Sequence, residues 1–142
     1  MAESTSDSRG HAHIFPVRVY YDDTDAGGVV YYANYLKMAE RARTEMMRGG
    51  GLEHGRLLAD HGVMFAVRRC EADYMKPARH DDLIEVHTAI AETGRASFWL
   101  DQVFRRGGND LARIKVQIVC VSREGRAVGL PPPVIAALRP FS

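Results

Sequence analysis

The second half of the chain alternates between apolar and polar positions, which is the pattern of strands with one buried face. Four such runs lie between residues 63 and 123, and Arg68 breaks the alternation in the first of them. Their apolar positions are Met64, Ala66, Cys70, Ala72 and Tyr74; Ile84, Val86 and Ile90; Phe98, Leu100 and Phe104; and Ile114, Val116, Ile118 and Cys120. Turn residues follow at positions 80–82, 92–94, 107–110 and 124–125. Because these connections are short, the pattern predicts an antiparallel meander over residues 63–123.

The first half carries one long helical pattern. Apolar residues recur at helical spacing over residues 33–48, and three consecutive glycines at 49–51 end the pattern. A strand is predicted before this helix over residues 14–21, and a short second helix after it over residues 52–61. An alternating sheet needs a layer that covers its apolar face, and the long helix is the only sizeable candidate. The sequence therefore predicts an α+β fold in which a curved antiparallel sheet wraps around one helix.

Length and composition indicate one ordinary globular domain. The chain has 142 residues, of which we assign 14–142 to this domain. Residues 1–13 are Ser-rich and aperiodic, so we expect a mobile N-terminal tail. A formal net charge of +1 gives no electrostatic case for nucleic acid or an anionic membrane. No apolar run approaches a membrane span and no signal peptide is evident, so we expect a cytoplasmic protein.

The segment that joins the first strand to the long helix concentrates the candidate chemistry. Asp22, Asp23 and Asp25 precede the pair Gly27 and Gly28. Glycine permits a sharp turn and close approach to a ligand, and a helix start offers unpaired N–H groups to a developing oxyanion. A carboxylate beside such a helix start can act as acid, base or nucleophile. The same residues can equally form a polar loop that caps the helix, and spacing alone favours that alternative.

Residues 21–45, YDDTDAGGVVYYANYLKMAERARTE, closely resemble the signature of the hotdog-fold acyl-CoA thioesterases. The resemblance is strongest to the branch associated with the Tol–Pal envelope system, with 4-hydroxybenzoyl-CoA thioesterase as a near relative. It implies a hotdog fold with five strands, a catalytic role for Asp25, and a substrate loop at Gly27 and Gly28. It also implies that the backbone N–H of Tyr32 holds the thioester carbonyl. Many members of the Tol–Pal branch carry His where this chain has Tyr32, whereas the hydroxybenzoyl branch has Tyr there.

The reaction implied by this resemblance is hydrolysis of acyl-CoA thioesters to free acid and CoA. Asp25 would serve as nucleophile or as general base, and no cofactor or metal would be needed. Acyl-carrier-protein thioesters remain a second possible substrate class, and the resemblance implies a homodimer or homotetramer. An acyl-CoA-binding or envelope-associated interaction protein with little turnover is the alternative. Hydration of an enoyl thioester is a weaker rival, because it generally needs a His that the motif does not offer.

Residues outside the motif carry weaker predictions. Arg79, Arg123 and Arg126 fall near strand ends or turns and are candidates for the phosphates of CoA. Glu40 is interpreted as a salt-bridged helix residue. Four histidines without partners at metal or triad spacing are interpreted as ordinary side chains: His54, His61, His80 and His87. The two cysteines, Cys70 and Cys120, fall on apolar strand faces and are predicted to be buried thiols.

Overall fold

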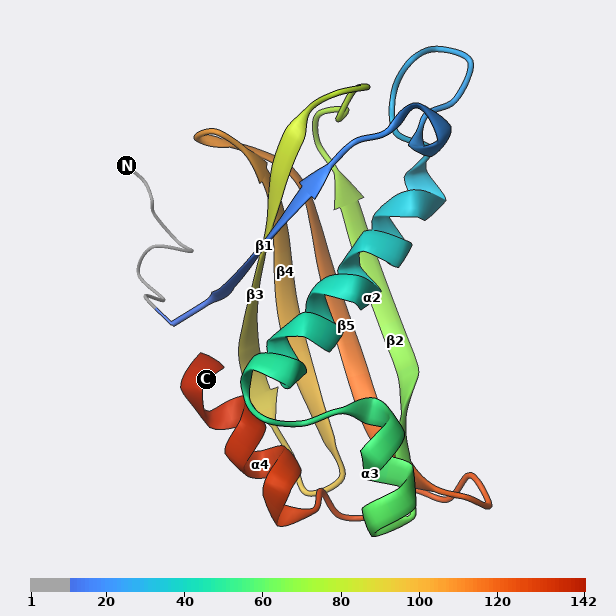
Figure 1. The fold of residues 1–142 in the computed structure, drawn as a ribbon, viewed down its shortest axis with the longest axis vertical. Helices are drawn as coiled ribbons and strands as arrows, with labels where there is room; N and C mark the ends of the chain where they lie inside the picture. The colour runs from blue at the N-terminus through green and yellow to red at the C-terminus, as the bar shows by residue number, and fades with distance from the viewer. Residues whose placement is uncertain (1–10) are drawn as a thin grey trace.

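The computed structural model describes residues 11–142 as a five-stranded antiparallel sheet with one long helix lying across it (Figure 1). The elements, in chain order, are β1 (His13–Arg18), the 3-10 turn η1 (Tyr21–Asp23), α2 (Tyr32–Gly49), α3 (His54–His61), β2 (Val63–Tyr74), β3 (Leu83–Thr93), β4 (Ser97–Arg106), β5 (Asn109–Ser122), α4 (Pro132–Leu138) and the 3-10 turn η2 (Arg139–Phe141). The predicted α+β architecture, with its long and short helices, is therefore confirmed.

The order of the strands corrects the predicted meander. The sheet runs β1-β3-β4-β5-β2, so only β3, β4 and β5 form hairpins with their neighbours in sequence. The strand β2 pairs with β5 at one edge, whereas β1 takes the free side of β3 at the other edge. Residues 75–82, which we call the crossover segment, carry the chain from the β2 edge to β3 (Figure 1). The prediction was wrong because a turn signal marks a change of direction and does not identify the strand that will be the partner.

The first strand also differs from its prediction. It covers His13–Arg18, beginning and ending earlier than the predicted residues 14–21. Its last pair is Arg18 with Leu83, where β3 begins, so no partner strand remains for the residues that follow. The N–H of Val19 instead donates to the carbonyl of Asp82 in the crossover segment. Of the predicted tail, residues 1–10 lie outside the described part of the chain, and His13 belongs to β1.

Helix α2 supplies most of the layer over the concave face of the sheet. Ala39, Ala42 and Met46 are fully buried on its inner side. The apolar core forms two clusters along the helix, and a buried polar group lies between them. The side-chain amide of Gln102 on β4 donates to the Ala39 carbonyl at 3.0 Å and to the Thr88 hydroxyl at 3.1 Å. These bonds satisfy a fully buried amide and fix α2 against β4.

The edge strand β2 is covered much less than the pattern predicted. The register with β5 shifts between Val67 and Arg69, which confirms the irregularity predicted at Arg68. Beyond this shift Cys70 is exposed, so its predicted burial is wrong, whereas Cys120 on β5 is buried as predicted. Beyond the shift the alternation identified the inner face, because Cys70 pairs with the buried Val116. Before the shift the prediction was wrong, because Val63 and Phe65 face the core in place of Met64 and Ala66. At this edge, however, α2 covers that face only in part, and residues 67–74 of β2 are exposed.

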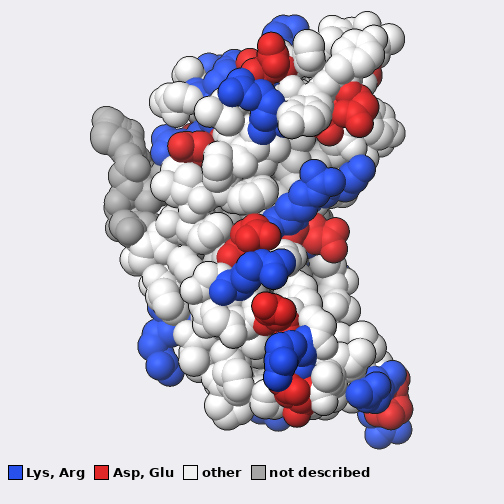
Figure 2. All heavy atoms as spheres, viewed as in Figure 1, with Lys and Arg blue, Asp and Glu red and all other residues white. Residues whose placement is uncertain are grey.

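Charge is mixed on the face that α2 crosses, where acidic and basic side chains alternate (Figure 2). This distribution agrees with the formal net charge of +1. Among residues 11–142, no helix is both long enough and apolar enough to span a membrane.

Candidate functional site

The loop over residues 20–31, which we call the motif loop, holds the side chain of Asp25 at a fixed turn. The carboxylate oxygen Oδ1 accepts hydrogen bonds from the N–H of Gly27 at 2.8 Å and, at 3.4 Å, from that of Val29. The Asp25 N–H donates to the Val29 carbonyl at 2.9 Å, and Gly28 donates to the Asp25 carbonyl at 3.0 Å. Gly28 has φ +80°, a conformation that favours glycine. These hydrogen bonds hold the Asp25 carboxylate in place, and because Asp25 is exposed, the carboxylate remains accessible.

The neighbouring Asp23 has a structural role. Its Oδ2 accepts a hydrogen bond from the N–H of Tyr20 at 2.8 Å, which closes the short turn η1. Its carbonyl accepts from the side-chain amide of Asn34 at 2.8 Å and from the N–H of Tyr31 at 3.1 Å. The side chain of Asp23 therefore caps η1 and not α2, whose N-cap Tyr31 has no side-chain cap bond. The bonds to the Asp23 carbonyl join the motif loop to the first turn of α2.

Tyr32 is the first residue of α2, so its N–H belongs to the helix start that has no partner in the helix's own ladder. The positive end of the helix dipole lies at the same point. The hydroxyl of Tyr74 on β2 donates to the Tyr32 carbonyl at 3.3 Å, and the two rings meet edge to face. The Tyr32 side chain is 60% exposed. A small cavity of about 230 Å³ adjoins this helix start and is lined by Val30, Tyr32, Tyr35, Tyr74, Met75, Lys76 and Pro77.

The crossover segment fixes the far end of the motif loop. The buried Ala78 accepts a hydrogen bond from the N–H of Val30 at 2.8 Å. Its own N–H donates to the hydroxyl of Tyr35, in the first turns of α2, at 3.1 Å. Val29 and Arg79 also form an isolated β-bridge. The crossover segment, which follows β2 at its edge of the sheet, therefore helps to fix the start of α2 relative to Asp25.

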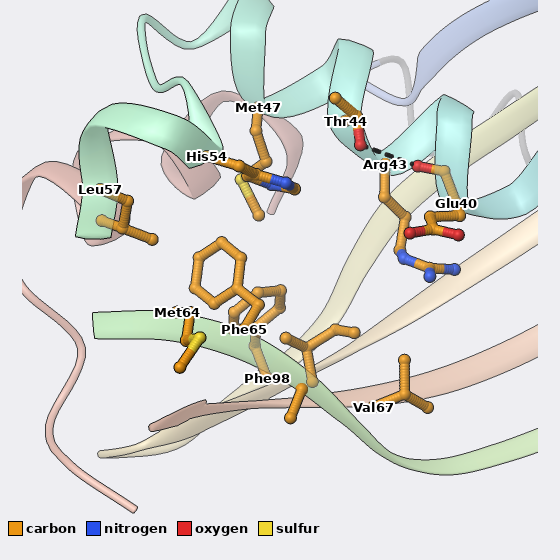
Figure 3. A pocket seen from close by; sticks show the side chains of 12 residues that line it. Glu40, Arg43, Thr44, Met47, His54, Leu57, Met64, Phe65, Val67 and Phe98 are labelled. Atoms are coloured by element: carbon orange, nitrogen blue, oxygen red, sulfur yellow. Dashed lines mark hydrogen bonds between the residues drawn. The ribbon is translucent and has the colours of Figure 1, made fainter. Parts of the chain in front are cut away.

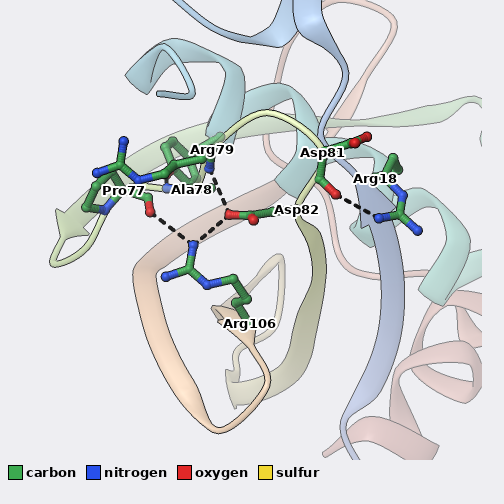
Figure 4. Close-up of polar contacts among 8 residues, drawn as sticks. Arg18, Pro77, Ala78, Arg79, Asp81, Asp82 and Arg106 are labelled. Carbon is green, nitrogen blue, oxygen red and sulfur yellow. Dashed lines mark hydrogen bonds and ion pairs between the residues drawn. The ribbon is translucent and has the colours of Figure 1, made fainter. Parts of the chain in front are cut away.

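The crossover segment is itself held by an ion pair between its Asp82 and Arg106 at the end of β4 (Figure 4). The guanidinium of Arg106 donates to the carboxylate of Asp82 at 2.6 Å and to the carbonyl of Pro77 at 3.4 Å. The same Asp82 oxygen accepts from the N–H of Arg79 at 2.9 Å. Burial alone would raise the pKa of Asp82, but the hydrogen bonds from Arg79 and Arg106 outweigh it, and the pKa lies below its usual value. The carboxylate is therefore charged at neutral pH.

The three arginines predicted for the phosphates of CoA do not meet within one chain. Arg79 lies beside the motif loop, where its backbone pairs with Val29. Arg123 follows β5, and its guanidinium donates to the carbonyl of Leu58 on α3 at 3.4 Å. Arg126 belongs to the turn after β5, where its backbone bonds to Ser122. This turn lies at the end of the molecule opposite the motif loop (Figure 1), so only Arg79 adjoins Asp25's loop in the same chain.

A second, larger cavity of about 280 Å³ lies between α2, α3 and β2 (Figure 3). Most of its lining is apolar, and the polar members come from α2 and the start of α3. The lining residues are Glu40, Arg43, Thr44, Met47, His54, Leu57, Met64, Phe65, Ala66, Val67, Phe98 and Ile118. The sequence reasoning did not identify this site, although four of its residues occur at helical spacing on α2, at positions 40, 43, 44 and 47.

Two predictions for the residues of this cavity need correction. Glu40 was interpreted as salt-bridged, yet within residues 11–142 its carboxylate has no cation within 4.0 Å. His54 was interpreted as an ordinary polar-face residue; it is exposed at the start of α3 as expected, but its ring also packs edge to face on Phe65 and lines the cavity. Burial, helped by the nearby positive charge of Arg43, lowers the pKa of His54. At neutral pH the imidazole is therefore uncharged.

The other histidines behave differently from one another. His87 lies 3.0 Å from the carboxylate of Glu85, and His80 packs edge to face on Tyr21. In the part of the chain that the structure describes, no three acidic, His or Cys side chains are grouped so that they could hold a metal ion.

Comparison with known proteins gives consistent matches over most of the chain. The family described as the Thioesterase-like superfamily matches residues 19–138. A protein of Haemophilus influenzae, named acyl-CoA thioesterase YbgC, is 41% identical over 124 residues, which cover 87% of this chain and 91% of that protein. The Escherichia coli protein named acyl-CoA thioester hydrolase YbgC is 44% identical over 108 residues, covering 75% and 80%.

Solved structures give the same result for the fold. The crystal structure of a probable thioesterase from Bartonella henselae matches with a TM-score of 0.82 and 36% identity. The match covers 84% of this chain and 99% of that one. The resemblance noted for residues 21–45, and the hotdog fold that it implies, are thereby confirmed.

Proposed function

We propose that this chain, which belongs to the thioesterase-like superfamily, hydrolyses acyl-CoA thioesters to a free acid and CoA. In this proposal Asp25 is the catalytic carboxylate, and the N–H of Tyr32 donates a hydrogen bond to the thioester oxygen. The observation that carries the proposal is the motif loop itself. It holds an exposed carboxylate by backbone hydrogen bonds close in sequence to the start of α2. The relatives named acyl-CoA thioesterase and thioester hydrolase, at 41% and 44% identity, support the reaction class.

The helix start would activate the thioester. When the N–H of Tyr32 donates to the thioester oxygen, it stabilises the negative charge that develops there during attack on the carbonyl carbon. The helix dipole adds to this stabilisation because the oxygen lies at its positive end. Removing one such donor typically costs about 3–4 kcal/mol in the transition state. The bonds from Ala78 and Tyr74 that fix this turn therefore matter for the rate.

Asp25 would act in one of two ways. As a nucleophile, its carboxylate bonds to the carbonyl carbon, the carbon–sulfur bond breaks, and CoA leaves as a thiolate that takes a proton from water. Water then cleaves the mixed anhydride, which releases the acid and restores the carboxylate. As a general base, Asp25 takes a proton from the water that attacks the carbonyl, and the leaving thiolate receives that proton. Both routes consume one water and need no cofactor.

The acyl group would extend along the groove between α2 and β2. Leu36, one turn after Tyr32, is 42% exposed, and Tyr74 and Val67 on β2 are 44% and 54% exposed. Tyr74 lines the cavity at the helix start and Val67 lines the larger cavity at Glu40, so an acyl chain along this strip would reach from one to the other. Burying an acyl chain against it is favourable at about 0.8 kcal/mol per methylene.

We also propose that two chains pair through the β2 edge. This edge strand carries exposed apolar residues, among them Met64, Val67 and Tyr74. Unpaired edges with exposed apolar side chains are generally covered in native proteins. Pairing here would place a second chain over the groove and complete its wall. A cytoplasmic location, use of acyl-carrier-protein thioesters and a link to the Tol–Pal system stay predictions from the resemblance.

Thiol release from a panel of acyl-CoAs tests the proposed reaction, with Asp25→Asn beside the wild type. Asp22→Asn is the matched control, because Asp22 is an exposed carboxylate of the same loop. We expect rapid release that falls at least about a thousandfold in Asp25→Asn and stays unchanged in Asp22→Asn. Full turnover by a folded Asp25→Asn protein would remove Asp25 from the mechanism. Tight binding of acyl-CoA without release by the wild type would favour the alternative of a binding protein.

A further inference from the structure

Helix α2 presents a half-buried cation to the larger cavity. Arg43 lines this cavity (Figure 3). Its Nη1 donates to the side-chain oxygen of Gln102 at 3.0 Å. No carboxylate lies within 4.0 Å of it among residues 11–142. Burial lowers the pKa of Arg43, and the nearby carboxylate of Glu40 opposes that shift. A guanidinium has five N–H donors, so several remain for a ligand in the cavity.

Glu40 lies beside Arg43 on the same wall, close enough to favour its charged form (Figure 3). The wall thus offers donors from Arg43 and carboxylate acceptors from Glu40, and the two charges offset each other. His54, at the start of α3, is uncharged at neutral pH, because its pKa is lowered chiefly by burial. The rest of the lining is mostly apolar, including Phe65 and Phe98.

The chemistry of this wall selects among acyl chains. An unsubstituted chain would leave the donors of Arg43 without an acceptor in a partly dehydrated site, which is costly. A chain that ends in a carboxylate would pair with Arg43 but would meet the negative charge of Glu40. A hydroxyl is both donor and acceptor, so it can bond to both side chains at once. Resting on the proposed thioesterase function, we propose that this cavity holds the distal part of the acyl group and selects aliphatic chains that carry a hydroxyl.

The geometry of α2 sets the position of that hydroxyl. Glu40 and Arg43 lie eight and eleven residues after Tyr32, which is about 12–16 Å along a helix with a rise of 1.5 Å per residue. An extended chain advances about 1.2 Å per bond, since one residue of three backbone bonds spans at most about 3.5 Å. The hydroxyl should therefore lie about ten to thirteen bonds from the thioester. A 12-hydroxydodecanoyl group meets this requirement.

Binding and turnover are measured with matched chains. The binding probes are uncleavable CoA thioethers with dodecyl, 12-hydroxydodecyl and 11-carboxyundecyl chains, titrated by calorimetry. The corresponding thioesters are tested for thiol release. We expect the hydroxylated chain to bind about tenfold more tightly than the dodecyl chain, the size of effect that a hydrogen bond to a charged group gives. Equal binding of the two chains would overturn the proposal.

Variants assign the preference to the wall. Arg43→Met should abolish the tenfold preference, whereas Arg41→Met, which removes a cation from the exposed side of the same helix, should keep it. A preference that survives in Arg43→Met would overturn the proposal. Because Arg43→Met also loses the bond to Gln102, Glu40→Gln gives a second test. Glu40→Gln should tighten binding of the carboxylated chain about tenfold. Unchanged binding would contradict the proposed pairing.

The two proposals can fail separately. If no thioester is cleaved but the hydroxylated thioether is still preferred, hydrolysis is rejected and the role of the cavity stands. If thioesters are cleaved with no preference between hydroxylated and plain chains, the role of the cavity is rejected and hydrolysis stands.

Discussion

The two cavities along α2 are built from different interactions. At the helix start, the N–H groups of Gly27 and Val29 donate to the Asp25 carboxylate, and that of Val30 donates to the carbonyl of Ala78, which together fix the motif loop. At the larger cavity, side-chain volumes set the shape, and the guanidinium of Arg43 donates to the side chain of Gln102. Hydrogen bonds are directional and constrain the groups that they join, whereas an apolar wall tolerates substitutions that keep its volume. We therefore expect the rate of thioester hydrolysis to depend on the helix start, and the preference among acyl chains to depend on the larger cavity.

Among the changes that test the difference between the two regions, substitution of Gly28 should have the largest effect on kcat. Gly28→Ala forces a side chain into a conformation with φ +80°, which costs about 1–2 kcal/mol and opens the turn at Asp25. We expect kcat for thiol release to fall about a hundredfold with a small change in KM, because loss of one oxyanion contact has this size. Gly107→Ala is the matched control, since Gly107 has φ +61° in the β4–β5 turn. It should lose similar stability, measured by urea unfolding, and keep its kcat.

Loss of the ion pair behind the crossover segment should have an intermediate effect. Arg106→Met leaves the carboxylate of Asp82 without its partner and frees the carbonyl of Pro77. We expect kcat to fall about tenfold with KM nearly unchanged, because the helix start shifts relative to Asp25. Arg106→Lys should recover part of the loss. Arg105→Met, which removes an ion pair with Asp110 in the neighbouring turn, is the control, and an equal loss of kcat there would argue against positioning by Arg106.

The same ion pair makes a prediction about pH. The pKa of Asp82 is lowered from 3.8 in the folded protein, so its contribution to stability is complete above the unfolded value and is lost as pH falls through the folded value. The Tm difference between the wild type and Asp82→Asn should therefore be largest near neutral pH. It should shrink once the pH drops below about 4. A difference that stays constant down to pH 2 would contradict the assignment.

Filling the larger cavity should have the smallest effect on the chemistry. Val67 is exposed on β2 and lines the cavity, so Val67→Trp should reduce its volume with little loss of stability. We expect thiol release from dodecanoyl-CoA to fall about fivefold and release from acetyl-CoA to stay the same, because a lost methylene contact is worth about 0.8 kcal/mol. Equal losses for both substrates would mean that the two regions do not act separately.

Local patterns predicted the elements of this fold but not their pairing. The helical spacing from Tyr35 to Met46 identified α2, and the irregularity at Arg68 appeared as a shift in register. Alternation is the same whichever strand lies alongside, so the pairing of β2 with β5 could not be read from it. For the same reason the exposure of Cys70 was missed, because burial depends on what covers an edge strand.

The site was predictable where it is contiguous in sequence. The resemblance over residues 21–45 marked Asp25 and Tyr32, whose roles stay proposals, and the structure adds the turn that holds the carboxylate. Arg43 and His54 were missed because their significance arises only when α2, α3 and β2 enclose a cavity. The ion pair of Arg106 with Asp82 was missed too, since it joins residues from two separate turns.

The crossover between the two edges of the sheet has a consequence for the order of folding. Strands β3, β4 and β5 form by local hairpins, whereas Val63 must find Ser122 and His13 must find Thr88 across long stretches of chain. Contacts between distant residues close late, because the entropy of closing a long loop is lost before they form. The motif loop becomes ordered only after both edge strands have docked and residues 75–82 lie between them. A partly folded chain can thus possess a nearly complete sheet while its motif loop is still unformed, and amide exchange should protect β4 before it protects Val30.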